Sequence, residues 1–345
     1  MTPKLEISAG ALRSNIAAMR ERIAPSALLF AMKDDAYGHG LEWSASVAAD
    51  AGVEWFGSYD VSAALRIRGI LGARDRIFAW ATSEDEEIAQ AVEADIDLGV
   101  GTHEYLARVI ASAERAGRQA RVHLKVDTGL HRNGIRPEDW AAAVGEARAA
   151  EEAGVIRLAG VWSHISEASD ADDDVSGEVF LRAVDEAETA GARPEVLHLT
   201  ASAASWWRPE LRGNLSRIGA FCYGIRSAEG PQLEGIRPIA TLSAPVIAVS
   251  AGTVTIGVGA LDGVPSTLIG APVGTAGGVF GIREIGATEI LVEAWPGAAV
   301  GQRVRLFGPG EQGEPSATDL AERIGTVGEE ILTRLSPRIP RVYGD

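Results

Sequence analysis

Short apolar runs alternate with longer amphipathic stretches over the first two thirds of the chain. The runs are rich in β-branched and aromatic residues, a composition that favours strands. The predicted strands are 28–33, 55–59, 76–80, 97–101, 121–127, 158–165, 196–200 and 215–223. The intervening stretches have helical periodicity. In 103–117, one face carries Leu106, Val109, Ile110 and Ala113, and Gly117 is a stop signal. Eight strands alternating with helices over roughly 230 residues predict an α/β fold, a TIM (β/α)8 barrel.

A doubly wound open sheet would give the same alternation and is the alternative on pattern alone. It is disfavoured because no glycine-rich dinucleotide fingerprint follows the first strand.

The pattern changes after residue 230, where the chain becomes rich in Val, Ile and Thr with frequent glycines. This composition is typical of a separate β-domain of short strands. Its predicted strands are 245–249, 253–257, 267–270, 288–294 and 303–307, and a helix is predicted near 317–324. We therefore expect a barrel domain over 1–232 followed by a smaller β-rich domain over 233–345.

Composition and charge narrow the function. The 345 residues carry 32 basic and 48 acidic side chains, a net charge of -16. Such a surface repels phosphate backbones and anionic lipids, which disfavours nucleic acid and membranes as partners. The single cysteine, Cys222, excludes an intrachain disulfide. The N-terminus lacks the features of a signal peptide, and no apolar run approaches about 18 residues, so we expect a cytoplasmic protein.

Polar and charged residues gather where the predicted barrel strands end, which is where barrel enzymes carry their chemistry. These residues are Lys33, Tyr37, Lys125, Asp127, Arg132, His164, His198, Ser202 and Arg217. Each alone could be a satisfied core group or a solvated loop end. Their gathering at one face of a barrel predicts an active site.

The most informative of these positions is Lys33, within residues 31–40, AMKDDAYGHG. A lysine at the end of a buried strand is costly to desolvate unless its amine is neutralised, paired or covalently used. The segment resembles the cofactor-lysine motif of the alanine racemase family, in which the lysine forms a Schiff base with pyridoxal 5'-phosphate (PLP). The resemblance implies that PLP is the cofactor, that Lys33 is the catalytic base and that Tyr37 binds the phosphate.

Four further segments resemble motifs of the same family: residues 123–132 (HLKVDTGLHR), 161–164 (VWSH), 198–204 (HLTASAA) and 216–224 (SRIGAFCYG). The resemblance implies that Arg132 reaches the phenolic oxygen of the cofactor and that Lys125 can be carbamylated to orient this arginine. His164 would lie under the pyridine ring and Arg217 would contact the pyridine nitrogen. By the same resemblance, the phosphate and ring contacts come from Ser202, Gly219, Ala220 and Tyr223, with His198 in support.

Arg217 is the most discriminating of these residues. An arginine does not give up its proton, so it leaves the pyridine nitrogen unprotonated and the ring a weak electron sink. This suits simple removal and return of a proton at the α-carbon of an amino acid.

The resemblance fails at the second base, a tyrosine that the family takes from the second subunit in a Val-Ser-Tyr-Gly motif. The matching stretch, 254–257, carries Ile256, which cannot transfer a proton. Thr275 and Glu329 likewise stand where the family has tyrosines, and no tyrosine lies between Tyr223 and Tyr343. Loss of a general acid–base group costs about 10²–10⁴ in rate. The smaller side chains at 256 and 275 indicate a substrate bulkier than alanine.

Asp262 could supply a replacement carboxylate, but an Asp before Gly263 is more typical of a turn.

Three hypotheses follow. The first is a racemase or epimerase of altered specificity that acts on an amino acid. The second is a PLP reaction that uses one base, such as elimination, aldol cleavage or transamination. The third is a non-catalytic PLP-binding homologue. The resemblance also implies a homodimer, and no metal site is expected.

Overall fold

A computed structural model describes residues 2–345 and groups them into two compact units. The barrel unit comprises Met19–Lys33 and Leu41–Gly219. The β-rich unit comprises the residues up to Ala18, Asp34–Gly40 and Ala220–Asp345. The division of the chain at residue 232 stays a prediction, but the first strand of the chain belongs to the sheet of the β-rich unit.

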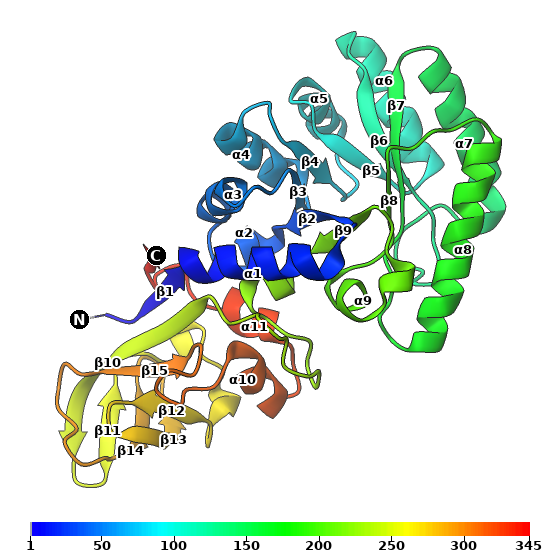
Figure 1. The fold of residues 1–345 in the computed structure, drawn as a ribbon. Helices are drawn as coiled ribbons and strands as arrows, with labels where there is room; N and C mark the ends of the chain where they lie inside the picture. The colour runs from blue at the N-terminus through cyan, green and yellow to red at the C-terminus, as the bar shows by residue number, and fades with distance from the viewer. Residues whose placement is uncertain (1) are drawn as a thin grey trace. The chain divides into compact units, whose positions relative to one another are not determined.

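The barrel unit is built on eight parallel strands, as the alternation predicted (Figure 1). They are β2 (Ala27–Ala31), β3 (Trp55–Ser58), β4 (Arg76–Ala79), β5 (Asp97–Val100), β6 (Ala120–Lys125), β7 (Ile156–Trp162), β8 (Val196–His198) and β9 (Leu215–Ile218). Neighbours in sequence are neighbours in the sheet, and β9 pairs with β2, Ala27 opposite Leu215. The amide of Arg217 donates to the carbonyl of Thr200 at 3.3 Å, beyond the end of β8. The sheet is therefore a barrel.

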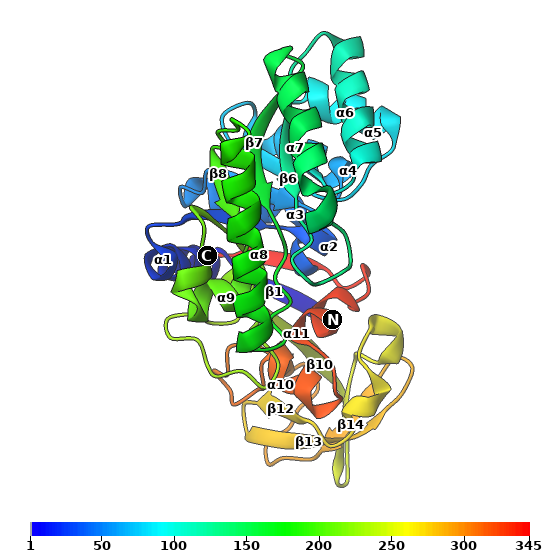
Figure 2. The same cartoon turned by 90° about the vertical axis from the view of Figure 1, so that its right-hand side faces the viewer.

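Helices cover the outside of these strands (Figure 2). They are α3 (Leu41–Asp50), α4 (Val61–Leu71), α5 (Asp85–Glu93), α6 (His103–Ala116), α7 (Pro137–Glu152), α8 (Asp170–Thr189) and α9 (Ser202–Trp207). Helix α6 shows why the predicted boundaries held. The Thr102 side chain accepts a hydrogen bond from the Tyr105 amide, and Gly117 ends the helix in the left-handed conformation.

The inside of the barrel combines an apolar cluster with two buried histidines. Its core cluster is Leu29, Ala31, Trp55, Phe78, Trp162, Val196 and Leu215. The ring of His123 stacks on Phe78 with centroids 4.7 Å apart, and the ring of His198 stacks on Trp162 at 5.6 Å. A side chain at Gly160 would meet His123, because its Cβ would lie 2.7 Å from the Nδ1 atom. Glycine at this position therefore makes room for a polar ring in the core.

The β-rich unit contains a second sheet of eight strands in the order β11-β14-β13-β12-β15-β10-β1-β16. The bounds are β1 (Lys4–Ser8), β10 (Ala240–Ser250), β11 (Thr253–Ile256), β12 (Pro272–Thr275), β13 (Gly278–Ile285), β14 (Ile290–Glu293), β15 (Arg303–Phe307) and β16 (Arg341–Gly344). Strand β1 runs antiparallel to β10 and parallel to β16. The described helices are α1 (Ala9–Ile23), which begins in this unit, and α10 (Ala317–Arg323) and α11 (Gly328–Thr333). No helix within residues 2–345 is both long and apolar enough to cross a bilayer.

One predicted strand of this unit, 267–270, is wrong. Residues Ser266–Leu268 form a single 3₁₀ turn, and the Leu268 amide donates to the carbonyl of Pro265 at 3.1 Å. Gly270 follows with a φ of +83°. The local turn uses the backbone groups that a strand would need for its ladder.

Lys33 begins a short turn, α2 (Lys33–Tyr37), with an unusual backbone. Asp34, Asp35, Ala36 and Tyr37 all have φ between 54° and 56°, in the left-handed region. L-residues pay roughly 1–2 kcal/mol each for this conformation, and such strain is typically found at functional segments. The turn is held by the amides of Gly38 and Gly40, which donate to the carbonyls of Asp34 and Asp35.

Candidate active site

The carboxyl ends of the barrel strands carry a cluster of cationic side chains. Lys33 follows β2, Lys125 is the last residue of β6, Arg132 lies in the loop after β6, and Arg217 lies in β9. Lys125 is 5% exposed, and burial together with the charges of Arg217 and Arg132 lowers the pKa of its amine to about 8. In a protein of net charge -16, this concentration of positive charge marks a site for an anionic ligand.

Arg217 is the most firmly held member of the cluster. Its Nη1 donates to the His198 carbonyl at 2.7 Å and lies 3.2 Å from His198 Nδ1. Its Nη2 donates to the Leu199 carbonyl at 2.9 Å and lies 3.2 Å from His164 Nδ1. A guanidinium has five N–H donors, so Nε–H is left, and within residues 2–345 it has no hydrogen-bond acceptor.

The charge of Arg217 survives its burial. Burial and the charge of Arg132 lower the pKa of Arg217 to about 9, against the opposing charge of Glu167. The side chain is therefore protonated at neutral pH.

His164 is neutral at physiological pH. Burial, and then the charges of Arg217, Arg132, Lys125 and Lys33, lower the pKa of His164 to about 2. A neutral imidazole that accepts at Nδ1 from Arg217 carries its proton on Nε2. The structure thus brings His164 together with Arg217, and its place under the cofactor ring stays a prediction.

Trp162 forms an aromatic wall of this cluster. The Lys125 Nζ lies 4.7 Å from the centroid of the Trp162 ring, and the Arg217 guanidinium carbon lies 5.2 Å from it. Cations at this distance over an indole are attracted by its π-face. Trp162 thereby stabilises two positive charges in a part of the barrel that offers few counter-ions.

Ser202 and Gly219 meet at the same end of the barrel. The Gly219 amide donates to Ser202 Oγ at 3.1 Å, which places a hydroxyl and an amide side by side. Glu167, which the sequence reasoning missed, accepts from the Ala204 amide at 2.7 Å. Burial raises the pKa of this carboxyl. No motif singles out Glu167, because its role depends on where the β7–α8 loop runs.

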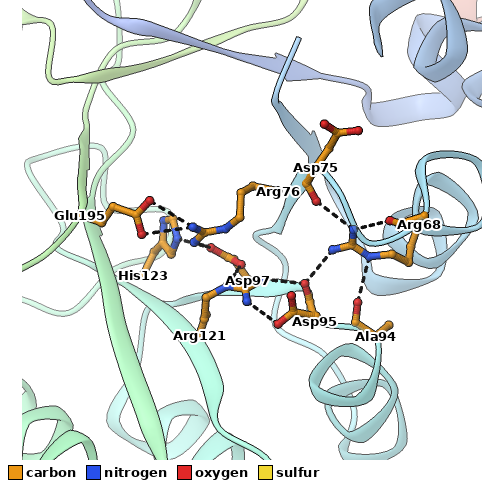
Figure 3. A network of polar contacts seen from close by, with 10 residues as sticks. Arg68, Asp75, Arg76, Ala94, Asp95, Asp97, Arg121, His123 and Glu195 are labelled. Carbon is orange, nitrogen blue, oxygen red and sulfur yellow. Dashed lines mark hydrogen bonds and ion pairs between the residues drawn. The ribbon is translucent and has the colours of Figure 1, made fainter. Parts of the chain in front are cut away.

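A second polar network, at the amino ends of the strands, was also missed (Figure 3). The fully buried Asp97 accepts from Arg76 Nη2 at 2.5 Å, from Arg121 Nε at 2.6 Å and from His123 Nε2 at 2.9 Å. Glu195 in turn accepts from Arg76 Nη1 at 3.1 Å. An acidic residue that opens an otherwise apolar strand was the available signal for Asp97.

Three predicted cofactor residues, Tyr37, Ala220 and Tyr223, belong to the β-rich unit. The rings of Tyr37 and Tyr223 have centroids 5.1 Å apart, and His39 stacks on Tyr223 at 5.0 Å. Burial and the charge of Glu329 raise the pKa of Tyr37, so its hydroxyl keeps its proton. The cofactor roles of these residues stay predictions.

Two of the three positions expected to depart from the family pattern, Ile256 and Thr275, have structural roles in the β-rich unit. Ile256 is fully buried in β11, paired with Val246 and Ile290 on the neighbouring strands. The Thr275 hydroxyl donates to the Gly278 carbonyl at 2.9 Å and closes the β12–β13 turn.

Asp262 occupies a turn, as the glycine that follows it predicted. Its carboxylate accepts from the Gly259 amide at 3.0 Å, and Gly263 follows with a φ of +96°.

The donors of the barrel unit fit the chemistry of PLP. The cofactor carries a phosphate, a phenolic oxygen and a ring nitrogen that must accept a hydrogen bond when it meets an arginine. The cationic cluster matches the negative charge, and the Arg217 Nε–H is a donor without an acceptor in the part of the chain that the structure describes. Lys33 supplies the amine at the end of β2.

Comparisons with known proteins agree with this arrangement. The family model for the N-terminal domain of alanine racemase matches residues 7–227, and that for its C-terminal domain matches residues 247–343. The alanine racemase of Thermobifida fusca is 37% identical over 367 aligned positions, covering 98% of this chain and 96% of that protein.

Solved structures give the same result. The alanine racemase of Streptomyces coelicolor A3(2) has a TM-score of 0.93 and 34% identity, covering 100% of this chain and 98% of that one. That of the D-cycloserine-producing Streptomyces lavendulae has a TM-score of 0.92 and 34% identity, covering 100% and 97%. With both domains matched and this identity along nearly its whole length, the chain belongs to the alanine racemase family.

Proposed function

We propose that this chain is a PLP-dependent racemase or epimerase of altered specificity, which acts at the α-carbon of an amino acid. Members of the family depend on PLP. The observation that carries the proposal is the guanidinium of Arg217, which is fixed by four hydrogen-bond contacts and has one donor to spare.

Bound PLP would make the α-proton of an attached amino acid acidic. Lys33 would hold the cofactor and move the proton on one face of the α-carbon. Arg217 would keep the ring nitrogen unprotonated through its Nε–H. Ser202 and the Gly219 amide would bind the phosphate, while Arg132 would face the phenolic oxygen and His164 the ring. Tyr37, Ala220 and Tyr223 complete the proposed set.

Altered specificity is supported by the β-rich unit. The sequence has no tyrosine between Tyr223 and Tyr343, so a tyrosine base from this region is absent. The expectation of a substrate larger than alanine rests on the smaller side chains that the sequence carries at 256 and 275.

The absence of this tyrosine also favours a second candidate, a PLP reaction that uses a single base. In that case Lys33 alone would remove and return the proton on one face of the substrate. We further propose a homodimer, on the resemblance to the family.

Hydrogen exchange in deuterated water separates these functions. Purified protein with PLP would be incubated with alanine and with larger amino acids, and the products would be analysed by NMR and chiral chromatography. Deuterium at the α-carbon with inversion is the result expected for racemisation. Exchange without inversion would establish one-base chemistry instead, and PLP binding without any exchange would identify a non-catalytic homologue.

A further inference from the structure

A continuous line of hydrogen bonds crosses the inside of the barrel from Asp97 to Arg217. His123 Nε2 lies 2.9 Å from Asp97 Oδ2, His123 Nδ1 lies 2.8 Å from His198 Nε2, and His198 Nδ1 lies 3.2 Å from Arg217 Nη1. Each of the four side chains is 6% exposed or less. The line therefore links the network at the amino ends of the strands, drawn in Figure 3, to the candidate active site at their carboxyl ends.

The line is anchored at an ionised carboxylate. Burial alone would raise the pKa of Asp97, but the hydrogen bond from His123 and the charges of Arg121 and Arg76 outweigh it. They hold the pKa of this carboxyl well below its usual range. At neutral pH Asp97 is therefore ionised and only accepts hydrogen bonds.

The groups at the two ends of the line fix the direction in which hydrogen bonds are donated along it, from Arg217 towards Asp97. A carboxylate can only accept, so His123 carries its proton on Nε2. A guanidinium can only donate, so His198 must accept on Nδ1 and carry its proton on Nε2. His198 Nε2–H then donates to His123 Nδ1, and every contact has one donor and one acceptor. A single proton per ring satisfies the whole line.

The surroundings of His198 favour its neutral ring, and the contacts around both rings hold them in place. Burial, and then the charge of Arg217, lowers the pKa of His198 far below its ordinary value. The missing side chain at Gly160 admits the His123 ring, whose Nδ1 would lie 2.7 Å from a Cβ there. Trp162 stacks on His198 and donates its Nε1–H to the His123 carbonyl at 3.1 Å. The rings cannot turn without breaking these contacts.

We propose that Asp97 is a positioning residue for Arg217, acting through His123 and His198, whose tautomers it fixes across the barrel. Because Asp97 sets the direction of donation, His198 offers Arg217 an acceptor and not a second donor. Arg217 is then held with both Nη atoms occupied and Nε–H facing the ligand site. The importance of this orientation rests on the proposed function, in which Nε–H meets the cofactor ring.

The first test is on the unmodified protein without cofactor. Long-range ¹⁵N–¹H NMR of the histidine side chains reports which nitrogen of each ring carries the proton. We expect both His123 and His198 as the Nε2–H form. A proton on Nδ1 of His198 in the wild-type protein would overturn the proposal, and this result does not depend on any variant or on PLP.

The second test compares Asp97→Asn with Glu195→Gln. The asparagine has one oxygen to accept hydrogen bonds from the three donors that surround Asp97, and its NH2 group would face one of these donors. We expect altered His198 resonances and a PLP affinity lower by about tenfold or more, the usual size of such indirect effects. Glu195 contacts Arg76 at the partly exposed edge of the same network, its side chain being 48% exposed, so Glu195→Gln should change neither.

A matched pair at His123 keeps the test decisive if Asp97→Asn does not fold. In His123→Gln the amide can donate to Asp97 and accept from His198, whereas His123→Leu can do neither. We expect glutamine to preserve the His198 tautomer and PLP affinity and leucine to lose both. Equal behaviour of the folded pair would contradict the proposal. If the wild-type protein shows the expected tautomers but binds no PLP, the proposed function fails and the positioning role of Asp97 stands.

Discussion

The barrel unit and the β-rich unit differ sharply in what their buried polar groups do. In the barrel unit, buried cations and histidines converge on strand ends and leave a donor, Arg217 Nε–H, directed at no partner within residues 2–345. In the β-rich unit, Ile256 packs in the core and Thr275 closes a turn. The contrast separates two kinds of burial. The barrel unit buries charged groups that the proposed function uses, whereas positions 256 and 275 of the β-rich unit serve its own packing.

The largest effect is expected at Lys33. Lys33→Ala removes the amine that would hold PLP, so the absorbance of the lysine-bound cofactor at roughly 420 nm should disappear. Any exchange activity should fall by at least about 10³-fold, because the same amine is the base. Absorbance spectroscopy and the deuterium assay measure both. An unchanged absorbance band would show that Lys33 does not hold the cofactor, and the contrast between the two units would then lose its basis.

Lys125 sharpens the electrostatic side of the comparison. The pKa of its amine is lowered from 10.5 to about 8. Below pH 8 both folded and unfolded chains carry the proton, and the folded chain bears the full cost of the buried charge. Between pH 8 and 10.5 only the unfolded chain stays protonated, so stability rises with pH.

Lys125→Met should remove this cost in the cofactor-free protein. We expect a gain of about 2–3 kcal/mol in unfolding free energy at pH 7, with no gain at pH 10.5. Urea unfolding at the two pH values, in buffer free of carbon dioxide to keep the lysine unmodified, gives the difference. The same gain at both pH values would show that the effect is packing and not charge.

Ile256 tests whether its position is core or active site. Because the side chain is fully buried, Ile256→Tyr should overpack the sheet and cost about 1–3 kcal/mol of unfolding free energy. Ile256→Val, which deletes one methylene, is the matched control and should cost about 1 kcal/mol. Denaturant unfolding measures both. A stable tyrosine variant with faster racemisation would break the comparison, since this strand would then reach the reaction.

Thr275 should give the smallest effect. Thr275→Val keeps the shape of the side chain but leaves the Gly278 carbonyl and the Gly277 amide without the hydroxyl. The expected loss is about 1–2 kcal/mol, with PLP affinity unchanged. Thermal unfolding with a PLP titration checks this, and a marked fall in PLP affinity would assign Thr275 to the site after all.

The barrel could be predicted from sequence because each of its strands pairs with its neighbour along the chain or with the first strand. Hydrophobic periodicity and glycine stops such as Gly117 are local signals, and local signals suffice for such a fold. The β-rich sheet was harder, because β1 pairs with β10 and β16, more than two hundred residues away. The assignment of Lys4–Ser8 to this sheet therefore follows only from the strand pairing in the folded structure.

The candidate site divides in the same way. Lys33, His164 and Arg217 lie in segments whose likeness to the family could be read directly from the sequence. The line from Asp97 to Arg217 could not be predicted from the sequence. It depends on which side chains of four different strands point into the barrel and come within hydrogen-bonding distance of one another. Glu167 could not be predicted for a similar reason, because the course of a loop, and not a sequence motif, brings it to α9.

The left-handed turn after Lys33 affects how mutational scans of this segment should be interpreted. Alanine is the customary neutral replacement, yet at Asp34, Asp35 and Tyr37 it would keep the Cβ that makes a φ near 55° unfavourable. Glycine removes both the side chain and the strain, and a D-amino acid introduced by chemical synthesis would find this backbone its natural conformation. At these positions an alanine variant reports the loss of the side chain on a backbone that stays unfavourable, whereas a glycine variant reports the side chain and the backbone together.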